Sequence, residues 1–488
     1  PLALPMGNYP RLVGWNSYCA IVGQGRIAEF PHQAANSLGR YSAVYRMGAV
    51  SFTATNHSTA FRHLEVMKTG EGHMNKFSLS ALVAAGVLAG GFATSASAAD
   101  LGGNCCADLE ERIAELEATT ARKGNRKVSL TVSGWVNQQI TFWDDGQESN
   151  VYIHDLGSTL GSHVKFTGQA TISPGWSAGY VLHIEAINSD GLTTSQDNDN
   201  GPAAYVGVAS GVQTLQSYWF VKSDQLGKVS VGLQSQASDN TAILVDGSGS
   251  LISANWVAYD VNSFGLRHKD GSLFAGENWG GAQGCAGMGG AWGDCNGLTR
   301  NVIRYDSPTF AGFSVSASWG EDDMWDVAAR YSGEFNGIKI AAAAAYNETT
   351  DVDMGAAPQS SNNYFQAGLY VQHVPTGLFV LGNYGILDVD GAADKADTWY
   401  VKAGLRTRLS ALGHTVFYGE YLNGKDGGFG PNSELDVWGA GVVQEIDAAA
   451  MSVWLKYRNL SYEDDFHQGA VNGIEDFQYV GVGAIINF

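Results

Sequence analysis

The sequence is poor in the features that mark helical membrane proteins and nucleic-acid-binding proteins. Charged residues make up only 16% of its 488 residues, and proline occurs 10 times and cysteine 5 times. No apolar run approaches the roughly 20 residues that a transmembrane helix needs. Basic residues number 28 against 48 acidic ones, so the formal net charge is −20 at pH 7. This balance argues against a nucleic-acid partner, because such binding needs a basic surface.

The first part of the chain lacks any regular pattern. Residues 1–73 show no sustained period of two or of 3.6 residues. Just before Met74 lie Gly70, Glu71 and Gly72. A purine-rich ribosome-binding site encodes these residues when it is translated. We interpret 1–73 as translated upstream sequence without a fold of its own. A genuine N-terminal domain is the alternative.

Residues 74–98 have the order typical of a secretory signal peptide. Lys76 provides the positive start, an apolar stretch covers 81–93, and Ala96-Ser97-Ala98 is the small-residue cleavage signal. The apolar stretch is too short to cross a bilayer as a helix. We therefore expect an exported protein whose mature chain begins at Ala99.

From residue 128 onward the sequence alternates with a period of two. Within 128–142, Val136 and Ile140 lie on one face, whereas Asn137 and Gln139 lie on the other. One apolar and one polar face are expected of a strand between lipid and water. A strand of a soluble sandwich gives the same alternation, so the number of strands and the rhythm of the loops must decide.

The strand count and the connections favour a transmembrane barrel. About sixteen candidate strands follow one another, an even number of the kind that bacterial outer-membrane barrels use. Short turns such as Asn336-Gly337 alternate with longer loops rich in Asp, Asn and Gly. We predict an all-β, antiparallel transmembrane β-barrel over 128–488, in the bacterial outer membrane. The candidate strands are 128–142, 162–172, 176–188, 213–223, 227–236, 300–306, 313–319, 324–335, 337–346, 363–374, 378–387, 398–410, 414–422, 434–445, 451–459 and 477–488.

The last candidate strand carries a specific local signal. Counting back from Phe488, the same face carries Ile486, Val482 and Val480. A final strand that ends on Phe with alternating apolar residues resembles the insertion signal read by the barrel-assembly machinery. We expect that machinery and outer-membrane lipid as partners.

A short helix is predicted before the first strand, within 99–127. Leu109, Ile113 and Leu116 form one apolar stripe, and the rest of the helix surface is charged. The stripe is shorter than two heptads, which is too short to associate alone. We expect a small periplasmic coiled coil that helps three barrels to associate. A helix lying on a single barrel is the alternative.

The features that carry a resemblance to a known family are Ala99-Asp-Leu-Gly-Gly103, the helix with Arg122-Lys-Gly-Asn125, Lys127-Val-Ser-Leu-Thr-Val-Ser-Gly134, Gly227-Lys-Val-Ser-Val-Gly232, Arg304-Tyr-Asp-Ser-Pro308 and the terminal Phe488. With them, the mature chain resembles the trimeric general-diffusion porins of alphaproteobacteria over nearly all of its length. The resemblance implies a sixteen-stranded barrel, a homotrimer, and a third extracellular loop folded into the lumen as a constriction. The vicinal Cys105 and Cys106 and the N-terminal extension depart from the family pattern.

The constriction can also be placed from the sequence, because 237–299 is much the longest loop. It contains Asp239, Asp246 and Asp260 as candidates for an acidic side of the pore. Opposed acids and bases set a transverse field that filters ions and orients polar solutes. For each base, a solvated wall charge without a special role is the alternative. The bases that alternation places toward the lumen are Lys165, Lys228, Arg300, Arg304, Arg330, Lys402, Arg406, Arg408, Lys456 and Arg458.

The cysteines fit an exported protein. Cys285 and Cys295 lie in one Gly-rich stretch of the long loop, and a disulfide is typical of an oxidising compartment. Two free thiols are the alternative. A metal site is disfavoured because it would need histidines close by.

Together these observations predict a water-filled channel for passive diffusion of small hydrophilic solutes and ions. Sequence motifs for a phosphate-binding loop, a zinc protease and a hydrolase nucleophile elbow are missing, so we expect no catalysis, no cofactor and no metal. The competing classes are a barrel enzyme, an adhesin or receptor, and a substrate-specific channel. The acidic outer loops favour mild cation selectivity at low salt.

Overall fold

The computed structural model describes residues 127–488, with the exception of 158, 187–189, 200–210, 256–259, 284–298, 322 and 353–359. The predicted signal peptide, the short helix and all the cysteines lie outside the described residues. Among those that are described, no helix is long and apolar enough to cross a membrane.

Most of the described chain is strand. The alternating segments that predict strands form them because each can turn its apolar side chains outward and its polar ones inward. The strands are β1 (Thr131–Asp144), β2 (Ser149–His154), β3 (Ser162–Ser173), β4 (Trp176–Ala186), β5 (Val212–Ser223), β6 (Gly227–Ser235), β7 (Gly265–Arg267), β8 (Leu273–Asn278), β9 (Thr299–Asp306), β10 (Phe313–Gly320), β11 (Trp325–Phe335), β12 (Ile338–Val352), β13 (Ser360–His373), β14 (Leu378–Val389), β15 (Ala396–Ser410), β16 (Gly413–Lys425), β17 (Glu434–Ile446), β18 (Met451–Glu463) and β19 (Phe477–Asn487).

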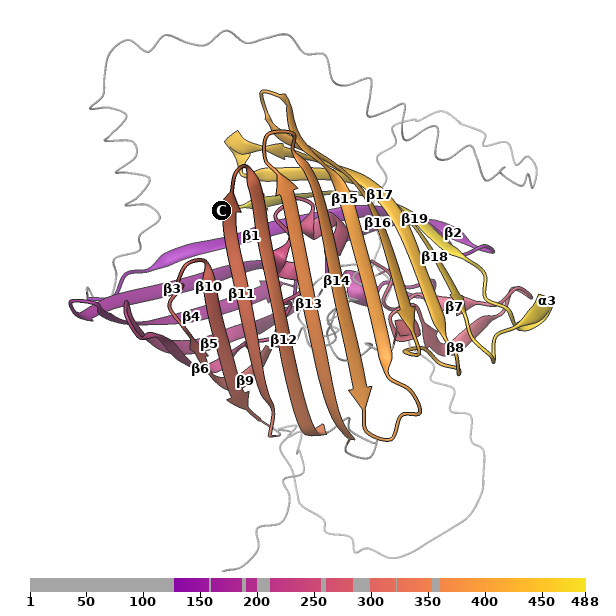
Figure 1. Cartoon of the computed structure of the whole chain (residues 1–488). Coiled ribbons are helices and arrows are strands. Elements are labelled where there is room, and N and C mark those ends of the chain that lie inside the picture. The colour runs from indigo at the N-terminus through magenta and orange to yellow at the C-terminus, as the bar shows by residue number, and fades with distance from the viewer. Residues whose placement is uncertain are drawn as a thin grey trace, which may run out of the picture. The chain divides into compact units, whose positions relative to one another are not determined.

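The strands form one closed antiparallel barrel of sixteen positions. From β3 to β6 and from β9 to β19, each strand pairs with the next along the chain, and β6 pairs directly with β9 across the long loop (Figure 1). The barrel closes because β19 pairs with β1, where Trp135 lies opposite Asn487. The short strand β2 and the start of β3 together occupy one position beside β1. The strand hydrogen bonds are therefore completed around the whole ring, as a lipid environment requires.

The barrel wall is inverted relative to a soluble protein. On β1, Val136 and Ile140 are 54% and 38% exposed, whereas Asn137 and Gln139 between them are each 1% exposed. The same alternation runs along β13, where Gln366 is buried and Leu369 is exposed. Apolar side chains thus face outward and polar ones face the lumen, as predicted from the sequence.

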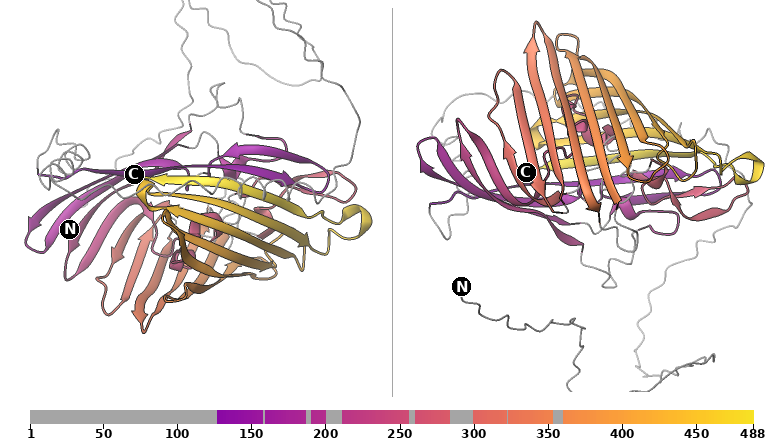
Figure 2. Two further views of the ribbon diagram at one scale, coloured as in Figure 1. Left: turned by 90° about the horizontal axis from the view of Figure 1, so that it is seen from above. Right: turned by 60° about the horizontal axis from the view of Figure 1, so that its bottom comes forward.

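The two rims of the barrel differ. Seen from the other sides, the strands are joined by tight turns on one rim and by longer connections on the other (Figure 2). We call the edge formed by the tight turns after β3, β5, β9, β11, β13, β15 and β17 the short-turn rim. The turn between β11 and β12 uses Asn336 and Gly337 with φ of 51° and 76°, a left-handed pair that fits the twist of a two-residue hairpin.

The predicted strands are confirmed, with ends that differ by a few residues. The largest difference is at β12, which continues to Val352 although the sequence predicted an end at residue 346. Two features were not predicted. The six-residue strand β2 was taken as part of a loop, and β7 and β8 form a separate hairpin within the long loop.

Candidate pore constriction

The long loop after β6 leaves the wall and crosses the inside of the barrel. Its described parts are 237–255 and 260–283, and they include the short helical turns η3 (Ile243–Val245) and η4 (Leu251–Asn255). The turn η3 contacts β12 and β13, and η4 contacts β17. Figure 1 shows these turns within the ring of strands. The loop therefore lies against the inner wall rather than outside the barrel.

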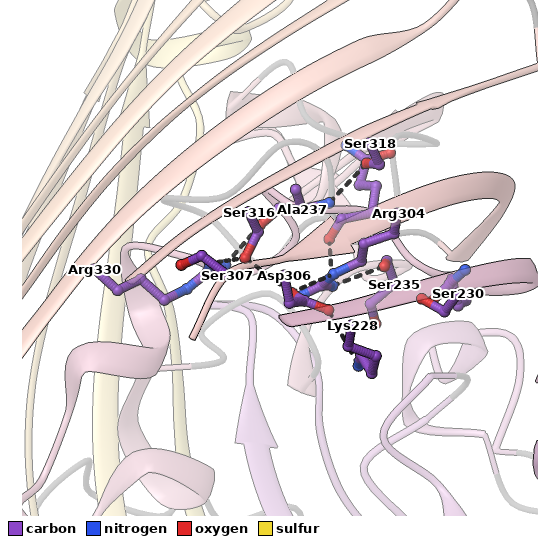
Figure 3. A network of polar contacts seen from close by, with 12 residues as sticks. Lys228, Ser230, Ser235, Ala237, Arg304, Asp306, Ser307, Ser316, Ser318 and Arg330 are labelled. Carbon is purple, nitrogen blue, oxygen red and sulfur yellow. Dashed lines mark hydrogen bonds and ion pairs between the residues drawn. The ribbon is translucent and has the colours of Figure 1, made fainter. Parts of the chain in front are cut away.

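Arg304 of β9 holds the point where the loop leaves β6 (Figure 3). Its Nη1 donates to the carbonyl oxygen of Ser235 at 2.9 Å and to that of Gln236 at 3.0 Å. Its Nε and Nη2 donate to Asp306 Oδ1 at 2.9 and 2.8 Å. Asp306 also pairs with Lys228 Nζ at 3.1 Å. Arg304 thus joins the first residues of the loop to the wall, and the predicted base Lys228 lies beside it.

Arg330 of β11 fixes the next turn of the loop. Its Nη2 donates to the carbonyl oxygen of Ala237 at 2.6 Å and to Thr241 Oγ1 at 2.9 Å, and its Nη1 donates to Ser316 Oγ at 3.0 Å. Figure 3 shows Arg330 and Arg304 reaching this point from different strands. Asp239, the first predicted acid, lies between Ala237 and Thr241 and lines the same cavity as the two arginines.

Asp326 of β11 and Gln366 of β13 hold the loop where it passes these strands. Ser238 donates to Asp326 Oδ2 through its backbone N–H at 2.7 Å and through its hydroxyl at 2.6 Å. Gln366 accepts from the N–H of Ala242 at 2.7 Å and donates to the carbonyl oxygen of Ser238 at 2.9 Å. The backbone N–H groups of Ser238 and Ala242 and the carbonyl oxygen of Ser238 thus have partners. This matters because an unpaired buried group costs about 1–3 kcal/mol.

Lys402 of β15 and Asp246 of the loop form a fully buried ion pair. The Nζ atom lies 2.6 Å from Asp246 Oδ2, and both side chains are 0% exposed. The same ammonium donates to Ser250 Oγ at 2.9 Å and to Asn255 Oδ1 at 2.6 Å. All three of its N–H groups therefore bind the loop, and the charge of Asp246 is neutralised at the wall.

Asp260 is the centre of a second buried cluster. Its carboxylate accepts from Lys456 Nζ at 2.5 Å, Tyr479 Oη at 2.8 Å and Gln139 Nε2 at 2.6 Å, and Arg458 Nη1 lies 3.6 Å away. Burial by itself would raise the pKa of this carboxyl, but the charges of Lys456 and Arg458 outweigh it and lower the pKa to about 2. Asp260 is therefore a carboxylate that joins the loop to β1, β18 and β19.

Arg458 connects this cluster to the neighbouring strands. Its Nε donates to Glu420 Oε1 at 2.7 Å, its Nη2 donates to the carbonyl oxygen of Ala254, and Glu420 also accepts from Tyr400 Oη at 2.6 Å. Arg458 and Glu420 side chains are 0% and 2% exposed. Burying such charges is tolerated only because each of them is paired and hydrogen-bonded.

Four other predicted bases lie along the wall, and Arg406 among them is a further contact of the loop. Arg406 donates to the carbonyl oxygen of Ser248 at 3.0 Å and pairs with Glu445. Arg408 pairs with Asp447 at the short-turn rim, where both side chains are about half exposed. Lys165 lies on β3 opposite His183, and Arg300 lies on β9 opposite Gln234.

Two further predicted sites stand apart from the loop. The N–H of Phe488 donates to the carbonyl oxygen of Gly134, and the N–H of Gly134 donates to that of Phe488, at 3.0 and 2.9 Å. The last residue thus completes the seam between β19 and β1. The predicted disulfide of Cys285 and Cys295 lies outside the described residues.

Sequence reasoning missed the partners that make these clusters. Glu420 and the tyrosines Tyr400 and Tyr479 belong to the lumen-facing phase of their strands. Their phase could have identified them as lumen-facing, since alternate residues of a strand share a face. The pairing between loop residues and wall residues could not be predicted from local sequence, because these contacts join segments far apart in the chain.

Comparison with known families gives one match over most of the chain. A family model described as "Gram-negative porin" matches residues 78–465. No curated protein sequence matches the chain.

Solved structures match the described fold. An anion-selective porin from Comamonas acidovorans is similar with a TM-score of 0.51 at 17% identity, over 74% of this chain and 100% of that one. OprB of Pseudomonas putida is similar with a TM-score of 0.49 at 12% identity, over 78% of this chain and 97% of that one. At these identities the likeness to the Comamonas protein concerns the fold alone.

Proposed function

The chain belongs to the family of Gram-negative porins, and from this premise we propose that its long loop 237–299 forms the constriction of the pore. The protein is an outer-membrane β-barrel channel for passive diffusion of solutes. The observation that carries this function is the inverted wall, with apolar side chains such as Val136 outward and polar ones such as Gln139 inward. Such a wall suits lipid outside and water inside.

The contacts of the loop support its role as the constriction. Arg304 and Arg330 hold its first turn, Lys402 holds its middle, and Lys456 holds Asp260. A loop fastened at points from β9 to β18 narrows the lumen and stays in place against the flow of solutes. The selectivity then depends on the charges that remain exposed beside the loop.

The functional unit is a homotrimer. Porin barrels expose a wide apolar wall, and closed rings with identical contacts are the usual way in which identical chains bury such surfaces. The helix within 99–127 assists this assembly as a short periplasmic coiled coil. The remaining wall faces outer-membrane lipid, and the strand ending on Phe488 is the segment that the barrel-assembly machinery reads.

Processing precedes assembly. The segment 74–98 acts as the signal peptide, and Ala99 is the first residue of the mature protein. Residues 1–73 are upstream sequence read in frame, so we expect no protein that contains them in the cell. Mass spectrometry of the mature protein from the native host should find Ala99 at its N-terminus, and recovery of peptides from 1–73 would contradict this reading.

The channel performs no catalysis and needs no cofactor. Several of its buried acids and bases are paired where they hold the loop, for example Asp246 with Lys402. Loops on the outer rim that act as an adhesin or receptor would be a second role, and a substrate-specific channel would be a narrower form of the first.

Reconstitution into a planar lipid bilayer tests the function. The purified protein should give large, stepwise increases in current that scale with the conductivity of the salt solution. A protein that inserts with a heat-modifiable barrel but gives no steps would overturn the proposed channel.

A further inference from the structure

A cavity lies beside the two arginines that hold the first turn of the long loop. It has a volume of about 330 Å³ and lies beside the turn between β9 and β10 on the short-turn rim. Its lining combines Arg304 and Arg330 with the hydroxyl groups of Ser314 and Ser316 and with Leu244 of the long loop. This volume is within the range of pockets that hold small organic molecules.

Arg330 brings a positive charge to this cavity without a carboxylate in contact. Its guanidinium donates to the carbonyl oxygen of Ala237, to Thr241 Oγ1 and to Ser316 Oγ, which are all neutral acceptors. Within the described parts of the chain, Arg330 forms no ion pair. The group is therefore held in one position, and its charge is available to an anion.

The two acids of the cavity do not cancel this charge. Asp306 is already shared by Arg304 at 2.8 Å and Lys228 at 3.1 Å. Burial raises the pKa of the Asp239 carboxyl to about 7, although a hydrogen bond with Ser235 and the charges of the arginines oppose the rise. Asp239 therefore carries only part of a negative charge at neutral pH, and the cavity keeps an excess of positive charge.

Leu244 supplies an apolar surface on the other side. Its side chain is 54% exposed, whereas its neighbours Ile243 and Val245 are 1% and 8% exposed and pack against the barrel. Its backbone N–H donates to the carbonyl oxygen of Asn240 at 2.9 Å, which fixes the turn that presents it. An apolar side chain held open beside an unpaired guanidinium matches a ligand with a charged head and an apolar body.

We propose that this cavity is a binding site for small organic carboxylates with an apolar body, which Arg330 holds by the carboxylate and Leu244 by the hydrocarbon. The inference rests on the proposed channel function and narrows it, because such solutes would pause at the short-turn rim while other solutes pass. A phosphate or sulfate ion would satisfy the arginine but would leave Leu244 without a partner.

Block of the ion current by two probes tests the site. Sodium hexanoate and sodium acetate are titrated into a bilayer that contains the full-length protein in dilute KCl. We expect hexanoate to reduce the ion current at a concentration about tenfold lower than acetate, since burying its additional methylene groups beside Leu244 strengthens binding. Equal concentrations for the two probes would overturn the proposal, whereas a protein without current would count against the channel itself.

Three variants test whether the block of the current by these probes depends on Arg330 and Leu244. Arg330→Gln should require an about tenfold higher concentration of both probes, because a charge-assisted hydrogen bond is lost. Leu244→Ser should make hexanoate resemble acetate and leave acetate unchanged. Lys395→Gln, which removes an exposed base at the other rim, is the matched control and should behave as the parent protein.

The Leu244 variant keeps the test decisive if Arg330→Gln disturbs the loop. Leu244 lies on the surface of its turn, so Leu244→Ser should fold. Heat-modifiable migration of the barrel in electrophoresis measures whether it does. Hexanoate block that survives unchanged in Leu244→Ser would show that the probe acts on the lipid or elsewhere in the pore, and the proposed site would be wrong.

Discussion

At the scale of single residues, Asp260 illustrates how charge is used inside this barrel. Its carboxylate accepts hydrogen bonds from Lys456, Tyr479 and Gln139, which come from three strands. Water is excluded there, so each charge depends on its partner. Such groups therefore serve to position the loop. Paired charges hold it because the wall presents its polar face to the lumen and offers no apolar side chains there.

Removal of the charge of Asp260 should weaken the barrel. In Asp260→Asn, Lys456 remains buried without its carboxylate, whereas Arg458 keeps Glu420. Breaking a buried pair in this way costs about 3–5 kcal/mol. The free energy of unfolding in urea and detergent should fall accordingly, and the single-channel conductance should rise as the loop loosens. Asp270→Asn, which changes an exposed acid of the same loop, should do neither. An unchanged stability of Asp260→Asn would show that the cluster holds nothing.

The pH dependence of this contribution has a definite sign. The pKa of Asp260 is lowered to about 2 in the folded barrel, below its ordinary value of about 3.9. The stability it adds is therefore present above pH 4 and is lost as the pH falls toward 2. Unfolding midpoints of the parent protein and of Asp260→Asn should differ at pH 5 and converge near pH 2. A difference that grows in acid would contradict the lowered pKa.

At the scale of elements, the strands could be predicted from the sequence and the path of the long loop could not. Each strand has lipid on one side and the lumen on the other, so apolar and polar residues alternate within the strand itself, as Val136 and Asn137 show. The strand β2 was missed because its six residues are too few to display a period. The pairing of Asp246 with Lys402 depends on where the loop lies in space. The residues next to either partner in the sequence do not indicate this pairing.

The same limit applies to the end of the long loop. Sequence reasoning predicts a disulfide between Cys285 and Cys295, which lie outside the described residues. Mass spectrometry of peptides from unreduced protein should find the two cysteines joined. Alkylation of both cysteines without prior reduction would instead identify them as free thiols.

At the scale of the whole molecule, assembly can be tested directly. The proposed homotrimer should migrate in electrophoresis as a species about three times the monomer, and heating should convert it to the monomer. Chemical cross-linking in mild detergent should give the same stoichiometry. A protein that remains monomeric in mild detergent while it still conducts would exclude the trimer as the functional unit.

Ion choice depends on which charges of the whole molecule remain exposed. The bases Lys402, Lys456 and Arg458 are neutralised by acids and buried, whereas Glu434 and Asp465 line an open cavity of about 540 Å³ at the outer loops. We expect mild cation selectivity at low salt that weakens as salt screens the loops beyond about 8–10 Å. Reversal potentials across a KCl gradient measure it. A firm anion preference at low salt would show that the exposed wall bases dominate.

The seam between β1 and β19 sets the order of events during biogenesis. Trp135 lies opposite Asn487, so the ring cannot close until synthesis has passed the final strand. Contacts of such long sequence separation form slowly. Until they form, β1 and the strand at the other end of the sheet present open edges that invite pairing with other chains. A chain truncated before Phe477 should therefore persist only while periplasmic chaperones occupy those edges, and should otherwise aggregate or be degraded.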